Sequence, residues 1–372
     1  MSKFEVLIER IDSVINHPGA DRLTINRIKG YTCISNKLED GSWRYQPGDL
    51  VVYIPADAVL PDKLLKEMGF WDDIKEKGFL AGSKGNRVKP IRLRGIFSEG
   101  ILRPLAGLPA GTGLGDDVAA WLGIEKYEQP IPVNFAGEVL SIGPSNTFKF
   151  DIENIRKYPE VLQIGERVIV TEKCHGTFCA FGYSDYEHPD LYKNVLWAAS
   201  KGLGQQGLVF KYNPTNLQNN LYIRTVVNFW DHLLEFKNEA SEGVFLNGKP
   251  KKIVVMGEIF GKGVQDLDYG FAKPEFRVFD ILVDNKFLNH DLRMRLVSAW
   301  GLEHVPVLYD GPYSPEAVEP FVNGKTTFAG EHTREGVVIK PAFERHDDVL
   351  GRVILKQISE EYALRKNGTE YQ

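Results

Sequence analysis

The sequence has few cysteines, no long apolar run and no surplus of positive charge. Its three cysteines, Cys33, Cys174 and Cys179, are too scattered for a disulfide framework or a structural zinc site, which favours a reducing compartment. No segment approaches the roughly 20 apolar residues that cross a bilayer, and acidic residues interrupt the N-terminus, so a signal peptide is not expected. We therefore expect a cytoplasmic protein without a membrane partner.

The common nucleotide-binding loops are also missing. No Gly-x-x-x-x-Gly-Lys-Ser/Thr loop occurs, and GLGQQG at residues 202–207, which matches Gly-x-Gly-x-x-Gly, is followed by the strand-like LVFKY instead of a helix. The formal net charge of −5 argues against a generally cationic nucleic-acid coat but leaves room for local basic grooves. Any nucleotide chemistry must therefore use a different apparatus.

The distribution of strand and helix signals predicts two domains in an α+β chain. The first third contains short strand-like segments separated by turn residues, which is typical of a small barrel or sandwich; they are residues 5–15, 23–34, 49–60 and 89–102. Residues 125–146 carry proline and glycine without clear periodicity and predict a linker or domain-entry segment. From residue 148 onward strands and helices mix. We place one module in residues 1–125 and a second domain in residues 126–372.

Six segments of the second domain carry chemistry-bearing residues in a fixed order. They are EKCHGT (172–177), SKGLG (200–204), GEIFG (257–261), FRVFDIL (276–282), EGVVIK (335–340) and ILKQIS (354–359). Each alone has a plain structural explanation, such as a solvated strand-end acid, a core phenylalanine or a lysine that protects an edge strand. Together and in this order they are hard to obtain by chance.

This series resembles the motifs of the covalent nucleotidyltransferase superfamily, which contains DNA ligases, RNA ligases and mRNA capping enzymes. The resemblance implies that Lys173 attacks ATP and becomes a lysyl-N-adenylate. It also implies supporting roles for further residues: catalytic Lys340 and Lys356, cofactor-binding Glu172, His175, Gly176, Lys201, Glu258 and Phe276, with Lys340 and Lys356 also touching the nucleotide, and metal-binding Glu335. The fifth motif departs from the pattern, because Ile358 stands where a second lysine is usual. That leaves open how many lysines touch the α-phosphate.

Elementary chemistry fits these roles. A lysine amine attacks phosphorus only when unprotonated, so neighbouring cations and a metal must lower its pKa from the usual ~10.4. Lys340 and Lys356 would supply that positive field and stabilise charge on the phosphate. Glu335 would hold Mg²⁺ or Mn²⁺. Glu258 would accept hydrogen bonds from the ribose, and Phe276 would stack on adenine if it faces the pocket.

The N-terminal module distinguishes the members of the superfamily. HPGADRLTINRIKG, residues 17–30, resembles the opening hairpin of OB-fold modules related to tRNA-binding domains. DNA ligases and capping enzymes carry an OB domain after the fifth motif, whereas only about one helix follows Ser359 here. An OB-fold β-barrel in front of an ATP-grasp-like ligase domain, with antiparallel sheets flanked by helices, resembles the type 5 RNA ligases.

A basic stripe in the N-terminal module is the candidate nucleic-acid contact. It contains no acid and consists of Lys84, Arg87, Lys89, Arg92 and Arg94. Such a run suits the tracking of phosphates, and a solvated basic hairpin is the less favoured alternative.

The resemblance implies an ATP-dependent RNA ligase that seals 3′-OH/5′-phosphate nicks in duplex RNA or RNA–DNA hybrids, through lysyl-AMP and 5′-adenylylated intermediates. We expect it to act as a monomer. The alternatives are a DNA ligase, a GTP-using capping-type transferase, and a catalytically inactive RNA-binding protein of the same fold. Intact Lys173, Glu258 and Glu335 weigh against the inactive alternative.

Overall fold

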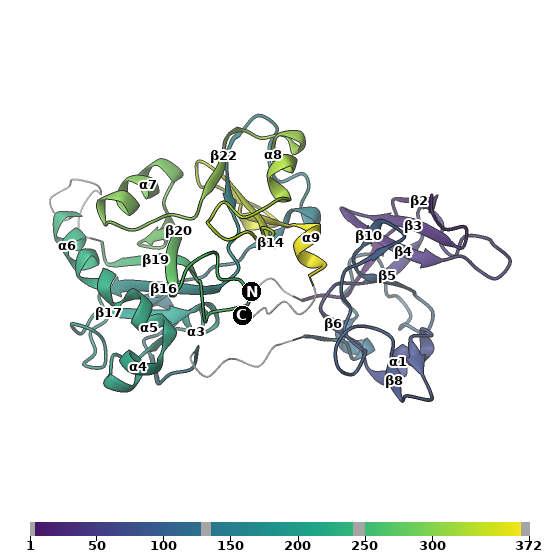
Figure 1. Cartoon of the computed structure of the whole chain (residues 1–372), viewed down its shortest axis with the longest axis horizontal. Helices are drawn as coiled ribbons and strands as arrows, with labels where there is room; N and C mark the ends of the chain where they lie inside the picture. The colour runs from purple at the N-terminus through teal and green to yellow at the C-terminus, as the bar shows by residue number, and fades with distance from the viewer. Residues whose placement is uncertain (1–3, 128–134, 241–249, 366–372) are drawn as a thin grey trace. The chain divides into compact units, whose positions relative to one another are not determined.

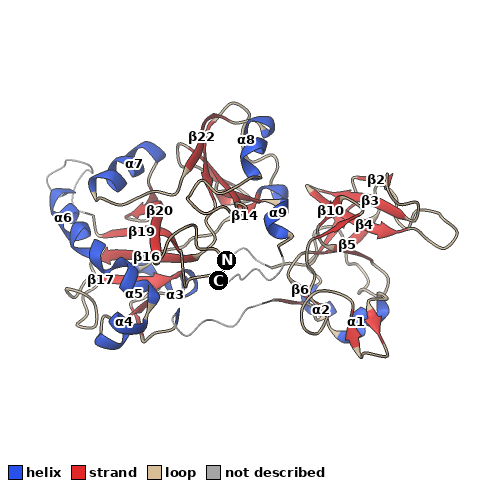
Figure 2. Ribbon diagram, in the orientation of Figure 1, coloured by secondary structure: helices blue, strands red, loops and turns tan. Residues whose placement is uncertain are grey.

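The chain forms two compact units, residues 2–128 and residues 129–372, in a computed structural model that describes residues 4–127, 135–240 and 250–365. Strands dominate both units, and helices are short and few by comparison (Figure 1, Figure 2). Within the described ranges, no helix combines the length and the apolar character needed to cross a membrane.

The N-terminal unit is built on two three-stranded antiparallel sheets. The first is ordered β1 (Leu7–Arg10), β5 (Leu50–Ile54), β11 (Ile101–Pro104), and the second β2 (Ser13–Asn16), β3 (Leu23–Ile28), β4 (Tyr31–Asn36). Because only two residues separate β1 from β2, one run of chain supplies an edge strand to each sheet. Ile11 N–H donates to the Asp49 carbonyl and Asp12 N–H to the Arg27 carbonyl, which joins the sheets at a corner as in a small barrel.

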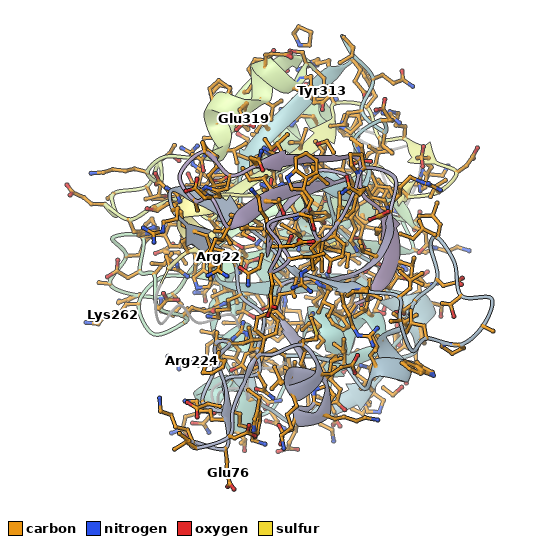
Figure 3. All side chains as sticks on the ribbon, turned by 90° about the vertical axis from the view of Figure 1, so that its right-hand side faces the viewer. Arg22, Glu76, Arg224, Lys262, Tyr313 and Glu319 are labelled. Atoms are coloured by element: carbon orange, nitrogen blue, oxygen red, sulfur yellow. The ribbon has the colours of Figure 1, made fainter. Side chains whose placement is uncertain are left out.

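Short elements complete this unit. They are β6 (Ala58–Val59), α1 (Asp62–Glu67), β7 (Trp71–Asp72), β8 (Lys77–Gly78), β9 (Ile91–Leu93), β10 (Ile96–Ser98), α2 (Ala119–Leu122) and β12 (Glu125–Lys126). Glu76 projects outward from the turn between β7 and β8 (Figure 3). The buried His17 imidazole accepts from Gly19 N–H through Nδ1, so its Nε2–H donates to the Leu93 carbonyl, 3.1 Å away. The HPGAD segment thus ties the turn before β3 to β9.

A seven-stranded antiparallel sheet forms the larger part of the second unit. Its order is β13 (Val139–Ser141), β18 (Leu208–Phe210), β17 (Leu196–Ser200), β16 (Thr177–Ser184), β19 (Lys252–Phe260), β20 (Glu275–Val283), β21 (Lys286–Phe287). One face packs on α4 (Pro214–Asn219), α5 (Leu221–Val226), α6 (Trp230–Ala240) and α7 (His290–Ala299) through residues such as Phe181, Ile223 and Leu296. The other face carries Phe148, Phe150 and Met256.

A second sheet of five strands lies in the same unit. Its order is β14 (Glu153–Asn154), β26 (Leu355–Ile358), β23 (Gly336–Pro341), β15 (Arg167–Glu172), β22 (Val307–Pro312), and only the β14–β26 pair is parallel. Helix α8 (Pro315–Val322) packs on it. The short hairpin β24 (His346–Asp347)–β25 (Gly351–Arg352) precedes β26, and α9 (Glu360–Ala363) follows it.

The predicted linker is wrong in part. Residues 128–134 lie outside the described residues, but Val139–Ser141 forms β13, an edge strand that pairs antiparallel with β18. Three residues give too short a pattern for a strand prediction. The sequence after GLGQQG is confirmed as a strand, because α3 (Lys201–Gln205) is followed by β18. No dinucleotide-binding turn is therefore formed there.

Buried charges connect the two sheets around Asp280 of β20. Its carboxylate accepts from Lys340 of β23 at 2.8 Å, from Arg352 at 3.0 Å and from Arg293 of α7 at 3.4 Å. Burial by itself raises the pKa of Asp280, but Arg352, Lys340 and Arg293 outweigh it and hold that pKa well below its usual range. The carboxylate is therefore ionised and compensates three buried cations.

We predict that Asp280→Asn destabilises the protein strongly, because it leaves three buried cations without their counter-charge. The expected loss in the free energy of unfolding is about 3–5 kcal/mol, measured by urea denaturation. Asp310→Asn is the matched control, since Asp310 pairs with Arg167 at the surface, and should cost at most about 1 kcal/mol. Equal losses in the two variants would contradict the central role of Asp280.

Candidate active site

Lys173 stands immediately beyond the end of β15. Its N–H donates to the Gly336 carbonyl at the start of β23, at 3.0 Å. Its ammonium meets the Glu335 carboxylate, with Nζ and Oε1 2.5 Å apart. The Lys173 side chain is 24% exposed and that of Glu335 only 8%. The lysine can therefore be reached from solvent while its carboxylate partner lies behind it.

Three further charged residues lie in the same electrostatic environment. They come from three different motifs: Lys201 at the start of α3, Glu258 on β19 and Lys356 on β26. Burial, with a contribution from Glu335, raises the pKa of Glu258 to about 8 against the opposing Lys173 and Lys201. Burial lowers the pKa of Lys356 to about 8. The positive charges of Lys173 and Lys201 add to this effect, and the carboxylate of Glu335 opposes it. Sequence motifs far apart along the chain thus meet at Lys173.

Glu335 offers a free oxygen that suits a divalent cation. While Oε1 accepts from Lys173, Oε2 is buried and has no hydrogen-bond partner among the described residues. Mg²⁺ in such sites is usually held by one or two carboxylates, with waters and substrate phosphates completing the shell. The described ranges contain no cluster of three or more His, Cys, Asp or Glu residues suited to a metal, so most ligands would have to come from elsewhere.

Lys340 does not reach this site, contrary to expectation. Its Nζ donates to the Asp280 carboxylate at 2.8 Å and to the Phe279 carbonyl at 2.9 Å, and the residue is 2% exposed. Burial and the nearby Arg293 lower its pKa. The positive field near Lys173 therefore comes from Lys356 and Lys201, and Lys340 serves the buried charge network.

Phe276 also faces the wrong way for the predicted adenine contact. It pairs with Ile259 across the sheet, so it lies on the face opposite to that of Glu258. Its ring is buried against Phe181, with a centroid distance of 5.5 Å.

A different aromatic group occupies the face of Glu258. Phe178 is the register partner of Glu258, and its ring lies 5.5 Å from that of Phe279 and 5.2 Å from that of Phe150. Phe178 and Phe279 are half-buried, so they offer the partly exposed aromatic surface that Phe276 does not.

The residues that flank Lys173 are held by the protein itself. The Glu172 carboxylate accepts from the Thr326 hydroxyl at 2.5 Å and from the Thr327 N–H and hydroxyl at 2.9 and 2.7 Å, so it anchors that loop. A Cβ on Gly176 would lie 2.1 Å from the Ile259 carbonyl oxygen, which explains the glycine by close packing. His175 is buried, and both its ring nitrogens have protein partners, Asp266 and Tyr362. No motif in the sequence marks either partner.

The basic stripe is divided by the structure. Lys84, Arg92 and Arg94 are exposed and Lys89 is half-buried. Arg87 instead forms an ion pair with Asp57 at 2.5 Å and stacks on the Tyr127 ring at 3.6 Å, so it is an internal structural residue. Residue types alone could not show that pairing.

Comparison with known proteins assigns both parts of the chain. A family model described as RNA ligase matches residues 166–358, just over half of the 372 residues, and a model described as an OB-fold domain matches residues 6–105. A search of curated proteins finds no match.

Naegleria gruberi RNA ligase has a similar structure. A variant of it with ATP and Mn gives a TM-score of 0.73 at 23% identity, over 97% of this chain and 98% of that chain. The same protein with pyrophosphate gives 0.72 at 22% identity over 97% and 98%, and a variant with AMP and Mn gives 0.72 at 23% identity over 96% and 97%.

The fold is thus that of an OB-fold module followed along the chain by a sheet-rich ligase domain with helices. The chain belongs to the RNA ligase family.

The raised pKa of Glu258 predicts a specific pH dependence of stability. Between about pH 4.5 and 8 the folded chain keeps a proton on Glu258 that the unfolded chain has released. The free energy of unfolding contributed by this group therefore falls as the pH rises through that window. Glu258→Gln should remove this contribution, so thermal unfolding from pH 5 to 8 should show the variant gaining stability relative to the wild type. A difference that stays constant with pH would contradict the raised pKa.

Proposed function

We propose that this RNA ligase uses ATP and forms a covalent lysyl-AMP on Lys173. The observation that carries the proposal is the position of Lys173, whose Nζ lies 2.5 Å from the Glu335 carboxylate in the electrostatic field of Lys201, Glu258 and Lys356. Naegleria gruberi RNA ligase, which shares the fold, has been observed with ATP and Mn, with AMP and Mn, and with pyrophosphate, which supports the same choice of nucleotide and metal.

In the first step the Lys173 amine attacks the α-phosphorus of ATP. A P–N bond forms, the bond from the α-phosphorus to the bridging oxygen breaks, and pyrophosphate leaves. Glu335 is the group in contact with the ammonium and is placed to take its proton or to orient the free amine. Lys356 and Lys201 would balance the charge on the phosphates. A Mg²⁺ or Mn²⁺ ion held by Glu335 Oε2 would neutralise phosphate charge.

Nucleotide recognition would fall to the face of the seven-stranded sheet that carries Glu258. Phe178 and Phe279 offer an apolar surface for adenine, in place of Phe276. Glu258, with a pKa of about 8, keeps a proton near neutral pH and can therefore both donate to and accept from ribose hydroxyls.

The later steps would join nucleic-acid ends. AMP passes from Lys173 to a 5′-phosphate, and a 3′-hydroxyl then displaces AMP and forms the phosphodiester bond. We assign the adenylylation and joining steps to residues 126–372. Residues 1–125 would bind the nucleic-acid substrate through the exposed members of the basic stripe. The substrate we propose is a nick in duplex RNA or an RNA–DNA hybrid, sealed by a monomer.

Lys173→Ala should abolish transfer of label from α-labelled ATP to the protein, because the nucleophile is gone. Lys173→Arg should fail equally, since a guanidinium stays protonated and cannot attack. The measurement is denaturing electrophoresis after incubation with Mn²⁺, with labelled GTP as the comparison nucleotide. Labelling of either variant would show that Lys173 does not carry the AMP. Preferential labelling with GTP would favour a capping-type transferase.

Replacement of Lys84, Arg92 and Arg94 with alanine should weaken binding of a nicked RNA duplex and flatten its salt dependence, by roughly one unit of slope for each phosphate that the protein no longer neutralises. Arg87 stays in place because the fold uses it. A variant lacking Arg22, Lys63 and Lys77 removes the same charge from exposed positions outside the stripe and serves as the control. If both variants bind the duplex equally weakly, the stripe has no special role.

A further inference from the structure

The loop that follows Lys173 is clamped by one distant segment. Gln265 donates from Nε2 to the Gly176 carbonyl. Asp266 Oδ1 lies 2.7 Å from His175 Nε2, and the Tyr269 hydroxyl accepts from His175 N–H at 2.5 Å. The segment 265–269 therefore holds His175 and Gly176, which follow Lys173 closely in the chain.

The C-terminal helix α9 holds the same loop from another direction. The Tyr362 hydroxyl lies 2.7 Å from His175 Nδ1, and Arg365 donates to Asp266 Oδ2 at 2.9 Å while stacking on the Tyr362 ring at 4.0 Å. At its N-cap, Ser359 N–H donates to the Glu335 carbonyl at 2.9 Å. The helix is therefore bonded both to the loop of Lys173 and to its carboxylate partner.

These contacts define the state of the His175 ring. Asp266, paired with Arg365, is a carboxylate and can only accept, so His175 Nε2 carries a proton. In a neutral imidazole Nδ1 is then an acceptor, and Tyr362 is the donor. His175 is 3% exposed and both nitrogens are in use, so the ring fixes the loop and does not touch the reacting atoms.

We propose that Tyr362 and Asp266 are positioning residues for the adenylylation step, acting through His175 to hold Lys173 in line with its target. The inference rests on the proposed lysyl-AMP chemistry. A displacement of about 1 Å at a nucleophile can cost about a hundredfold in rate, so release of a clamp two residues from Lys173 is expected to slow the chemical step more than nucleotide binding.

The test measures single-turnover formation of the protein–AMP adduct by the full chain over a range of ATP concentrations. Tyr362→Phe and Asp266→Asn should each lower the maximal rate about tenfold, with the ATP concentration at half-maximal rate changed less than twofold, at a temperature well below the unfolding midpoint of each variant. Tyr309→Phe is the matched control, because it removes a tyrosine hydroxyl that donates to the Pro312 carbonyl at 2.8 Å on β22. Wild-type rates in both test variants would overturn the inference.

A second arm separates positioning from general loosening of the fold. In a His175→Ala background, Tyr362→Phe should cause no further loss, because both changes break the same path. If the double variant instead loses rate by the product of the two single losses, Tyr362 does not act through His175. If Tyr362→Phe does not fold, Asp266→Asn with its partly exposed carboxylate supplies the same comparison. A wild-type chain that forms no adduct overturns the proposed function together with this inference, whereas an active wild type with unaffected variants overturns the inference alone.

Discussion

The antiparallel pairing of β15 with β23 is the constraint on which the site depends. Glu172 pairs with Val337, so Lys173 comes opposite Gly336, and Glu335 lies one residue further on. This register brings an ammonium and a carboxylate 162 residues apart in sequence into contact. β23 is fixed at its other end as well, because Lys340 is bonded to the buried Asp280 of β20. A shift of β23 by one residue along β15 would turn Glu335 and Lys340 to the other face of the sheet. Their contacts with Lys173 and Asp280 would then be broken.

The charges of the site are arranged for an anionic ligand. Lys173, Lys201 and Lys356 lie together with Glu258 and Glu335, and burial moves Glu258 towards its protonated form and Lys356 towards its neutral form. In each case burial, which penalises the charged form, outweighs the opposite charges nearby. Phosphate oxygens would supply compensation for the lysines, and a divalent cation would supply it for the orphan oxygen of Glu335. A metal-bound polyphosphate, as the proposed chemistry requires, would supply both kinds of charge.

Much of this architecture follows from sequence pattern, and the failures have identifiable causes. Strand-like runs rich in β-branched and apolar residues carry Glu258 and adjoin Lys173 and Glu335, and residue type and motif order indicate that the three belong to one site. The prediction for Phe276 is wrong because β20 contains a bulge. Met256 pairs with Asp280 but Gly257 pairs with Val278, so Phe279 is an extra residue in β20. Without this bulge, Phe276 would share the face of Asp280. With the bulge, Phe276 points into the core on the opposite face of the sheet.

The other failures concern partners that lie far away in the chain. Lys340 and Arg87 have the residue type of phosphate ligands, but Asp280 and Asp57 neutralise them inside the fold. His175 likewise looks like a ligand for the nucleotide until Asp266 and Tyr362 take both its nitrogens. Hydrogen bonds are directional, so a buried polar network fixes the loop of Lys173 more narrowly than apolar packing would. Lys173 stands just beyond a strand end and two residues from this network, so under the proposed mechanism residues without any motif would help to orient the nucleophile.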